Sequence, residues 1–545
     1  MTVTQPTRVP ATRRPVETSP RTTPGLNPTG ADVRGGAKLY GAFSVETFCN
    51  AGPLGLTHDD AEGWLAYVSQ FNAPNFHYRD AGVKIWAYYE TYDNWQDTYG
   101  LDAVRSCYHS GHGAMDANGV FYVPMGAAWA GNDCTATSSN MRLGNEGLRY
   151  VFWSTCESLR VLDGHSPVRT WSAANLGLRM IFGFETVSWD DARYGSGFWH
   201  HWKQGKSLST AWLDASWDIA TDQAPSVSAN GATAEEAQHR LFNERYLAAE
   251  PASTAWWWWR WYDVRGSAAR EPSRHVPAEP RGLVLAPITS RSLSSVAQRF
   301  DVDASAAEHL PGSTAMSAGN RVVHLGDDGT VSATLAEPNL ANRTALPRAA
   351  AASMAADAVR AFGLDEHGPL VIDRIVAMQE AGATQAGDGQ AEGPFTTGTI
   401  VQLRQAVEGM TVITPGAGTV RVTLDNDGTV VHVQSSTREV EGFFDQPRTT
   451  PREPAPPGGA GGDDTSMSGD PADVDARLAD AFGRRLRAIV AAGAAPVGYS
   501  TVPGTTEVGY DLRAHSAVLV AQRAVEVDFG RGLRKRYWVS APIFG

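Results

Sequence analysis

The sequence predicts an α/β protein, in which a mainly parallel sheet flanked by helices is followed by small α+β modules, each with a helix and an antiparallel hairpin. Before residue 263, short apolar runs alternate with helical patterns, which is typical of the βα units of a parallel sheet. After that point, two Asp-Gly pairs each separate alternating apolar runs, which is a strong signal for a β-hairpin.

Length and composition limit the classes of protein to consider. A chain of 545 residues is too long for one hydrophobic core, so we expect several domains. The net charge of −13 argues against nucleic acid or an anionic membrane as the main partner. No apolar run is long enough to span a bilayer, so we expect no contact with a membrane.

The N-terminal segment and the cysteines bear on the compartment. The N-terminal residues are rich in Pro, Thr and Arg without an apolar block, so we expect a disordered tail rather than a signal peptide. Four cysteines without a CxxC pair make the cytoplasm the default location. An exported form with a Cys107–Cys134 disulfide is the alternative.

Composition divides the chain into five segments. Trp and Tyr are concentrated before residue 263, and the stretch 264–282 reads as a boundary. A second boundary is the Pro- and Gly-rich run QPRTTPREPAPPGGAGGDDTSMSGDP. We therefore expect a tail (1–36), an α/β domain (37–265), one or more α+β modules (283–445), a linker (446–471) and a C-terminal α+β module (472–545).

Within the α/β domain, apolar periodicity predicts each element in turn. The run RYVFWS is apolar almost throughout, as a strand buried on both faces should be. Asp59 or Asp60 is the expected N-cap of the first helix. The predicted strands are 38–45, 83–90, 103–109, 119–124, 149–154 and 178–184, and the predicted helices are 59–71, 197–204 and 208–220.

The later modules repeat a weak pattern of a helix followed by a hairpin. The DGTV stretches are predicted to be hairpin turns rather than calcium loops, because the ligand spacing of an EF-hand is absent. The predicted helices are 292–300, 349–364 and 474–493, and the predicted strands lie within 320–335, 418–434, 516–529 and 534–543.

Two strand ends carry the candidate catalytic residues. The segment His109-Ser-Gly-His112-Gly113 follows one predicted strand, and Cys156 follows another. If these strands are parallel neighbours, both ends meet at one edge of the sheet. A cysteine nucleophile needs a nearby imidazole, and the N–H groups of Gly113 and Cys156 could hold an oxyanion.

These segments resemble the caspase–legumain–gingipain group (clan CD) of cysteine peptidases. The resemblance rests on CYHSGHGAMDANGVFYVP, on VFWSTCESL and on LGLRMIFGFETVSWDDARYGSGFWHHWKQGKSLSTAWLDAS, the last being similar to gingipain-like and bacterial caspase-like domains. Over roughly residues 38–222 it implies a caspase–haemoglobinase-like fold, with Cys156 as nucleophile and His112 as acid/base. It also implies a specificity pocket lined by Ser188, Trp189, Asp190 and Asp191.

Substrate preference stays open, because the pocket residues match neither the caspase nor the legumain pattern in full. The sequence shows no marked cleavage site that would split the domain into two subunits. Glu185, Asp190 and Asp191 near the expected pocket make a basic residue the first guess for the residue before the cleaved bond.

The later modules resemble the PepSY/FTP-type propeptide modules of bacterial proteases, through the stretch TGTIVQLRQAVEGMTVITPGAGTVRVTLDNDGTVVHV. That resemblance implies inhibition or chaperoning of the first domain through an intramolecular contact. The expected function is therefore a cysteine-dependent hydrolase of peptides or proteins, using no cofactor or metal and restrained by its own C-terminal modules. The alternative is an inactive caspase-like binding or scaffold protein.

Simpler interpretations of the site residues remain open. Cys156 could be an ordinary core cysteine and His112 a stabiliser of a Gly-rich turn. His109 is the rival base, although a structural role is favoured for it. His109 and His112 with a cysteine could instead hold zinc, as in a metal-dependent hydrolase.

Three other features have structural interpretations that are at least as good as functional ones. The pair His200-His201 is favoured as a packed helix face, and Asp190-Asp191 as a cap or a solvated turn. The Trp-rich run 256–261 is favoured as an edge strand or a helix packed on the first domain, and the functional alternative is a surface for stacking sugars or peptides.

Overall fold

The computed structural model describes residues 26–29, 37–131, 133–288, 291–386, 391–446, 471–491 and 496–543. The predicted tail and the predicted linker lie almost entirely outside these residues. Among the described helices, none is long and apolar enough to cross a membrane.

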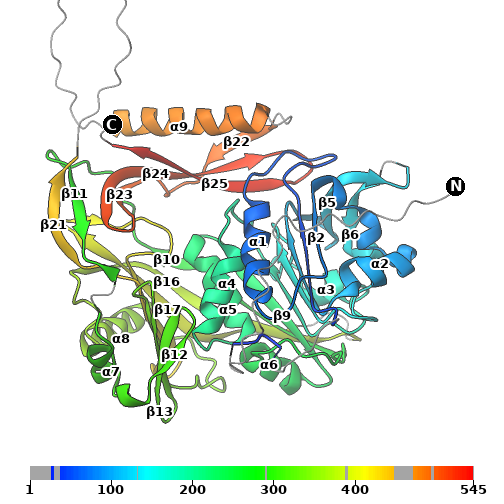
Figure 1. Ribbon diagram of the computed structural model, residues 1–545, viewed down its shortest axis with the longest axis horizontal. Helices are drawn as coiled ribbons and strands as arrows, with labels where there is room; N and C mark the ends of the chain where they lie inside the picture. Colours follow the sequence, from blue (N-terminus) through cyan, green and yellow to red (C-terminus); the bar gives the residue numbers. More distant parts are fainter. Residues whose placement is uncertain are drawn as a thin grey trace, which may run out of the picture.

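One large mixed sheet runs through most of the molecule, with helices packed on it (Figure 1). Its first strands, in spatial order β2-β1-β3-β7-β8, are parallel, and the pairs formed by every later strand are antiparallel. The predicted α/β class is confirmed. The prediction of a mainly parallel sheet holds for these five strands and is wrong for the whole sheet, because strands of the later modules continue it.

The bounds of the elements in the first half follow the predicted alternation. The strands are β1 (Tyr40–Ser44), β2 (Phe76–Arg79), β3 (Ser106–Ser110), β7 (Tyr150–Ser154), β8 (Met180–Phe184), β9 (Pro225–Gly231) and β10 (Trp256–Ala269). The helices are α1 (Thr57–Val68), α2 (Asp93–Tyr99), α3 (Pro167–Trp171), α4 (Tyr194–Lys203), α5 (Leu208–Ile219) and α6 (Ala234–Asn243). A small separate sheet contains β4 (Ala114–Met115), β5 (Phe121–Trp129) and β6 (Asp133–Thr137).

Alternation along each central strand divides the side chains between two cores. On β7, Phe152 packs in the cluster that includes residues of α1, α4 and α5, while Val151 and Trp153 pack in the cluster on the opposite face. All five residues of this strand are buried, as its apolar run predicted. The sheet is therefore covered on both faces and leaves its edges and strand ends as the places for a site.

Two predictions in the first half are wrong. The predicted strand at 83–90 forms short 3-10 turns instead, and its apolar side chains, such as Trp86 and Tyr88, fill the core as an irregular segment. Periodicity could not reveal this, because burial requires apolar residues in any conformation. The edge strand is β2, which the sequence reading missed. Helix α1 has no side-chain cap from Asp59 or Asp60.

The Trp-rich strand β10 is central in the sheet, between β9 and β16 (Leu370–Thr384). Trp257, Trp258, Trp259 and Trp261 are each at most 2% exposed. The predictions of an edge strand and of a stacking surface are therefore wrong. These indoles pack in the two cores of the first half, where residues of β16 such as Met378 and Ala381 join them.

The second half continues the sheet in antiparallel order. Both DGTV stretches form hairpins, between β14 and β15 and between β19 and β20, which confirms their prediction. The strands are β12 (Glu308–Leu310), β13 (Ser313–Ala318), β14 (Arg321–Gly326), β15 (Val331–Thr334), β16, β17 (Glu392–Val407), β18 (Met410–Thr411), β19 (Thr419–Asp425) and β20 (Val430–Ser435), with helices α7 (Leu293–Phe300) and α8 (Arg348–Ala361).

A second sheet is built mainly by the C-terminal segment. Strand β24 (Ser516–Asp528) pairs with β11 (Arg281–Leu285), β22 (Gly498–Thr501), β23 (Glu507–Leu512) and β25 (Arg534–Pro542), and β21 (Val440–Asp445) pairs with β11. Two strands of the predicted module 283–445 thus belong to the sheet of the C-terminal module. With helix α9 (Pro471–Ala491), this sheet forms a layer across the side of the molecule that carries α1 (Figure 1).

A disulfide ties the segment after β1 to β6. Cys49 is bonded to Cys134, whereas Cys107 and Cys156 are free and buried. The alternative Cys107–Cys134 pairing is therefore wrong, because Cys107 lies inside the central strand β3. The bridge fixes the loop that follows β1, and this loop contacts the candidate site.

We predict that the unreduced, denatured chain has two titratable thiols and that reduction raises the number to four, since the chain has four cysteines and two are free. Replacing Cys49 by Ser should lower the free energy of unfolding by about 2–4 kcal/mol, because the bridge closes a long loop. Thiol titration and urea unfolding measure both, with Cys107→Ala as the control that keeps the bridge. Four thiols before reduction would contradict the pairing.

Candidate active site

The two strand ends that carry His112 and Cys156 lie side by side. Strands β3 and β7 are parallel neighbours, with Ser110 paired to Ser154, and the Gly111 N–H donates to the Ser154 carbonyl at 3.3 Å. His112 and Cys156 each follow their strand by two residues. The arrangement that the sequence interpretation required is therefore present.

The thiol of Cys156 lies in a buried turn. The residue is 1% exposed, and the next residue, Glu157, has a φ of 53°, a conformation that non-glycine residues rarely adopt. The Ser188 N–H donates to the sulfur at 3.3 Å, and the Ser188 hydroxyl lies 3.4 Å from it. The thiol itself donates to the carbonyl of Arg534 at 3.0 Å. That carbonyl belongs to the C-terminal strand β25.

His112 is fully buried and neutral. Its Nε2–H donates to the Gly52 carbonyl at 3.0 Å, so Nδ1 carries the free lone pair. The rings of Phe48 and Phe529 lie 4.9 and 5.0 Å from it. Burial, reinforced by the charge of Lys535, lowers the pKa of His112 to about 3. Among the described residues, no hydrogen bond joins His112 to the Cys156 sulfur.

The backbone around the thiol offers hydrogen-bond donors. In the described part of the chain, the N–H groups of Gly113 and Cys156 donate to no protein acceptor. A Cβ at Gly113 would lie 2.9 Å from the Thr155 side chain and 2.7 Å from Phe121. Glycine is needed here because the end of β3 approaches Thr155, the residue before Cys156, closely.

The predicted pocket residues divide into two groups. Ser188 contacts the Cys156 sulfur, and the nearby Asp190 carboxylate accepts from the Gly55 N–H at 3.1 Å. Glu185 accepts from the N–H of Leu162 at 3.3 Å, and Asp191 pairs with Arg193 at 2.7 Å. The last two carboxylates are thus directed away from the thiol.

Strand β25 lies directly over this site. The Arg536 N–H donates to the Ser188 carbonyl at 3.3 Å, and the Asp190 N–H donates to the Arg536 carbonyl at 3.0 Å, in a parallel pairing. The Trp538 ring stacks on Trp189 with centroids 4.3 Å apart. The C-terminal strand therefore extends the predicted pocket loop like an added strand.

Lys535 of this strand lies against the predicted pocket loop. It is 2% exposed, and its ammonium group donates to the Ser188 hydroxyl at 3.0 Å and to the Gly111 carbonyl at 3.4 Å. Burial raises the pKa of Asp190, whereas the charges of Lys535 and Arg485 act to lower it. The sequence interpretation missed Lys535, because nothing in the run RGLRKRYW distinguishes the one buried cation from its solvated neighbours.

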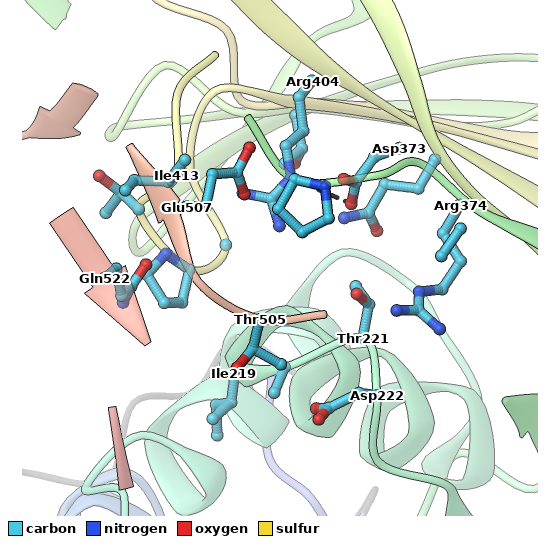
Figure 2. A pocket seen from close by; sticks show the side chains of 18 of the residues that line it. Ile219, Thr221, Asp222, Asp373, Arg374, Arg404, Ile413, Thr505, Glu507 and Gln522 are labelled. Atoms are coloured by element: carbon cyan, nitrogen blue, oxygen red, sulfur yellow. Dashed lines mark ion pairs between the residues drawn. The ribbon is translucent and has the colours of Figure 1, made fainter. Parts of the chain in front are cut away.

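Further polar contacts hold the C-terminal module in place. Arg534 pairs with Glu157 at 2.8 Å, and Arg485 of α9 pairs with Asp190 at 3.2 Å. A cavity of about 100 Å³ lies where the first half, the antiparallel sheet and the C-terminal module meet. Side chains of all three line it (Figure 2). There Asp373 pairs with Arg404 at 3.0 Å. This space suits small molecules such as water, and its ion pairs position the module.

A second histidine-centred chain lies at the same sheet edge. His58 contacts the Ser44 hydroxyl at 2.8 Å through Nδ1 and Asp80 at 2.9 Å through Nε2. Ser44 is fully buried and also contacts His77 at 3.0 Å. Because the hydroxyl is enclosed and already shared, we interpret this chain as a support for the loop after β1.

Asp60, which the sequence analysis considered only as a possible helix cap, is another buried group near this site. Its carboxylate accepts from Tyr108 at 2.8 Å, Ser110 at 2.7 Å and the Gly195 N–H at 2.8 Å. Burial raises its pKa to about 6. It joins the end of β3 to the start of α4 and so holds the strand that leads to His112.

The other histidines singled out in the sequence have structural partners. His109 contacts the Tyr88 hydroxyl at 2.8 Å, and burial together with Lys535 lowers its pKa to about 3. His201 is buried and contacts Asp218 at 2.7 Å, so the predicted packed face holds for His201, whereas His200 is half-buried and contacts Gln204 at 2.8 Å. Within the described residues, no group of three or more His, Cys, Asp or Glu side chains is placed to hold a metal ion.

The geometry thus defines an α/β protein with a covered thiol and imidazole at the carboxyl edge of its parallel strands. Residues 41–261 match the sequence model of a domain of unknown function, DUF6345. A comparison with curated proteins finds no match. An uncharacterized protein from Eubacterium rectale ATCC 33656 is similar over 49% of this chain and 84% of its own, with 7% identity and a TM-score of 0.26, which is too weak to support an argument.

We predict a pH-dependent stability that His112 controls. Its folded-state pKa of about 3 lies below the ordinary 6.5, so unfolding takes up a proton between these values. The stability that the neutral ring contributes is fully present above 6.5 and is lost as the pH falls toward 3. Between pH 7 and pH 5, the wild type should lose about 2 kcal/mol more than His112→Gln.

Urea unfolding followed by tryptophan fluorescence measures this difference. His309→Gln, in the exposed strand β12, is the matched control and should behave like the wild type. Equal losses in the wild type and in His112→Gln would show that the ring is not held neutral by its surroundings.

Proposed function

We propose that Cys156 and His112 are the catalytic pair of a cysteine-dependent hydrolase of peptide bonds, held closed by strand β25. The observation that carries the proposal is the meeting of a thiol, an imidazole and two unused N–H donors at adjacent parallel strand ends. The parallel strands with helices on their faces are also what a caspase–haemoglobinase-like fold requires.

In the open state, each group has a defined step. The His112 imidazole takes the thiol proton, and the thiolate attacks the carbonyl carbon of the peptide. The N–H groups of Gly113 and Cys156 stabilise the oxyanion, and the imidazolium then protonates the leaving amine. Water, deprotonated by the imidazole, attacks the thioester, which releases the carboxylic acid and regenerates the thiol.

The proposed substrate has a basic side chain before the cleaved bond. The site already accepts a lysine, since Lys535 is held there by the Ser188 hydroxyl and the Gly111 carbonyl, with Asp190 as the nearby negative charge. Buried ammonium groups need such partners. Glu185 and Asp191 take no part, because both are directed elsewhere.

The C-terminal module is proposed as the restraint on this activity. The Arg534 carbonyl caps the thiol, and Lys535 fills the pocket, so a substrate can enter only after β25 leaves. The strand runs parallel to the Ser188–Asp190 loop, and its edge contacts are few enough to be exchanged for those of a substrate strand.

The proposal includes a location outside the cytoplasm. A disulfide such as Cys49–Cys134 persists in oxidising surroundings, which favours a location outside the cytoplasm over the cytoplasmic default. The same bridge fixes the loop that supplies Phe48 and Gly52 to the His112 ring.

An inactive binding or scaffold protein is the second candidate. The observation that favours it is the enclosed sulfur, which is 1% exposed and has no hydrogen bond to His112 in the described residues. In that case β25 would be a permanent part of the fold. The two candidates differ in what happens when the strand is released.

We predict that the double variant Lys535→Ala/Trp538→Ala, the release variant, exposes Cys156. Loss of the pocket contacts and of the Trp189 stack should raise the rate of Cys156 labelling by a lysyl chloromethyl ketone at least tenfold. Mass spectrometry of the labelled peptide measures the rate. Tyr499→Ala, on an exposed part of the same module, is the matched control and should label like the wild type.

Equal labelling of the release variant and the wild type would contradict the restraint. A truncation near residue 265 is a poorer test, because it would remove β16 and expose the long edge of β10.

We predict that the release variant hydrolyses fluorogenic Lys and Arg peptides faster than Asn and Asp peptides. Adding Cys156→Ala or His112→Ala should reduce turnover at least about a thousandfold, since each removes one of two groups that act as a unit. Adding Cys107→Ala should retain turnover, because burial raises the pKa of that thiol well above its ordinary value. A labelled but inactive release variant would favour the scaffold candidate.

A further inference from the structure

A cavity of about 470 Å³ lies far from Cys156, between the helices of the first half and the antiparallel part of the sheet. Its volume is within the range of sites for small molecules. The turn between α4 and α5, strands β10, β16, β17, β19 and β20 and the loop 336–340 all contribute to its wall. Exposed Asn243 and Glu337 also line it, so it reaches the surface there.

Arg260 is a buried cation in this wall without a carboxylate partner. It is 5% exposed, and its nearest polar contacts are the hydroxyls of Ser209 and Thr210 at 3.4 and 3.3 Å. Glu380 lies opposite it on β16 and its charge acts favourably on Arg260, but no ion pair joins them within the described residues. The Glu380 carboxylate instead accepts from Gln238 at 2.9 Å and Trp258 at 2.8 Å.

Arg245 is a second cation without a carboxylate in the same wall. Within the part of the chain that the structure describes, its buried Nε has no hydrogen-bond partner, and its guanidinium forms no ion pair. The other cations nearby are compensated. Lys206 pairs with Asp214 at 2.7 Å, and Arg421 pairs with Asp214 at 2.9 Å and Asp218 at 2.6 Å.

The one buried carboxylate that lines the cavity is thus fully used. Asp214 also accepts from the Tyr262 hydroxyl at 2.7 Å. Within the described residues, neither Arg260 nor Arg245 forms an ion pair, and a desolvated charge without a close counter-ion is costly. An anion in the cavity would remove that cost, and guanidinium groups suit carboxylate and phosphate oxygens.

The remaining lining indicates what else the ligand carries. Hydroxyl groups of Thr210 and Thr423 can donate to further oxygens, while apolar walls can cover a hydrocarbon part. The guanidinium of Arg260 already lies 4.4 Å from the Phe242 ring, which shows that cation and apolar wall are adjacent. The apolar residues are Phe242, Pro338, Leu340, Met378 and Val431.

We infer that this cavity binds a small organic anion, in which a carboxylate or phosphate group contacts Arg260 and Arg245 and an apolar body lies against Phe242 and Leu340. The site is separate from Cys156, and its occupancy does not depend on peptidase activity. Since the wall comes from both halves of the chain, a bound anion joins them.

Calorimetric titration of the full chain tests this inference with benzoate and phenyl phosphate as probes. We expect at least one of them to bind, and Arg260→Gln and Arg245→Gln each to weaken it at least tenfold. Benzyl alcohol, which lacks the charge, and inorganic phosphate, which lacks the apolar body, should bind at least tenfold more weakly. Arg360→Gln, an exposed residue of α8, is the matched control.

Arg245→Gln is the second test if Arg260→Gln fails to fold, because replacing the partly exposed Arg245 should leave the fold intact. Equal affinity in Arg245→Gln and the wild type would overturn the inference, as would benzyl alcohol binding as well as benzoate. Absence of binding by both anions at millimolar concentration would also overturn it. A preference between benzoate and phenyl phosphate would identify which oxyanion the arginines accept.

Discussion

The candidate site depends on the buried position of Lys535, which accompanies a neutral His112 and a covered Cys156 thiol. Lys535 is 2% exposed, yet no carboxylate lies within ion-pair distance of it in the described residues, and a hydroxyl and a carbonyl oxygen receive its protons. Such a charge stays buried only when the strand around it is firmly placed. The pairing of Arg536 with the Ser188–Asp190 loop and the stacked indoles of Trp189 and Trp538 provide that placement. The neutral state of His112 and the capped thiol are both consequences.

The charges around Lys535 connect the C-terminal module to the acid–base chemistry. With the strand in place, burial and the positive charge of Lys535 both favour a neutral imidazole. Removal of the strand would take away the charge and admit water, so the pKa of His112 would rise toward its ordinary range. The imidazole would then be able to exchange a proton with the thiol near neutral pH. Release would therefore open the pocket and restore the base in one event.

Sequence patterns predicted the elements better than they predicted the sheet. The apolar run of β7 and the Asp-Gly hairpins follow from local physical rules, and they were predicted correctly. The segment 83–90 was not, because a buried irregular segment needs the same apolar residues as a strand. The sequence analysis also missed that the large sheet, with sixteen strands in the described residues, continues from the first half into the second. The strands that join there, β10 and β16, are far apart in sequence.

The site shows the same division between local and long-range information. Strand ends with His-Gly and Cys could be placed at one edge, because parallel strands bring their carboxyl ends together. Lys535 is 379 residues after Cys156 by sequence number (535 − 156), and no local pattern links them. Composition alone could not show which carboxylate would lie near the lysine. Of Glu185, Asp190 and Asp191, only Asp190 does. Which carboxylate faces the pocket is set by the turn after β8, where Glu185 meets the Leu162 N–H and Asp191 meets Arg193. The proposed preference for a basic side chain therefore depends on a single carboxylate, Asp190, whose own burial raises its pKa.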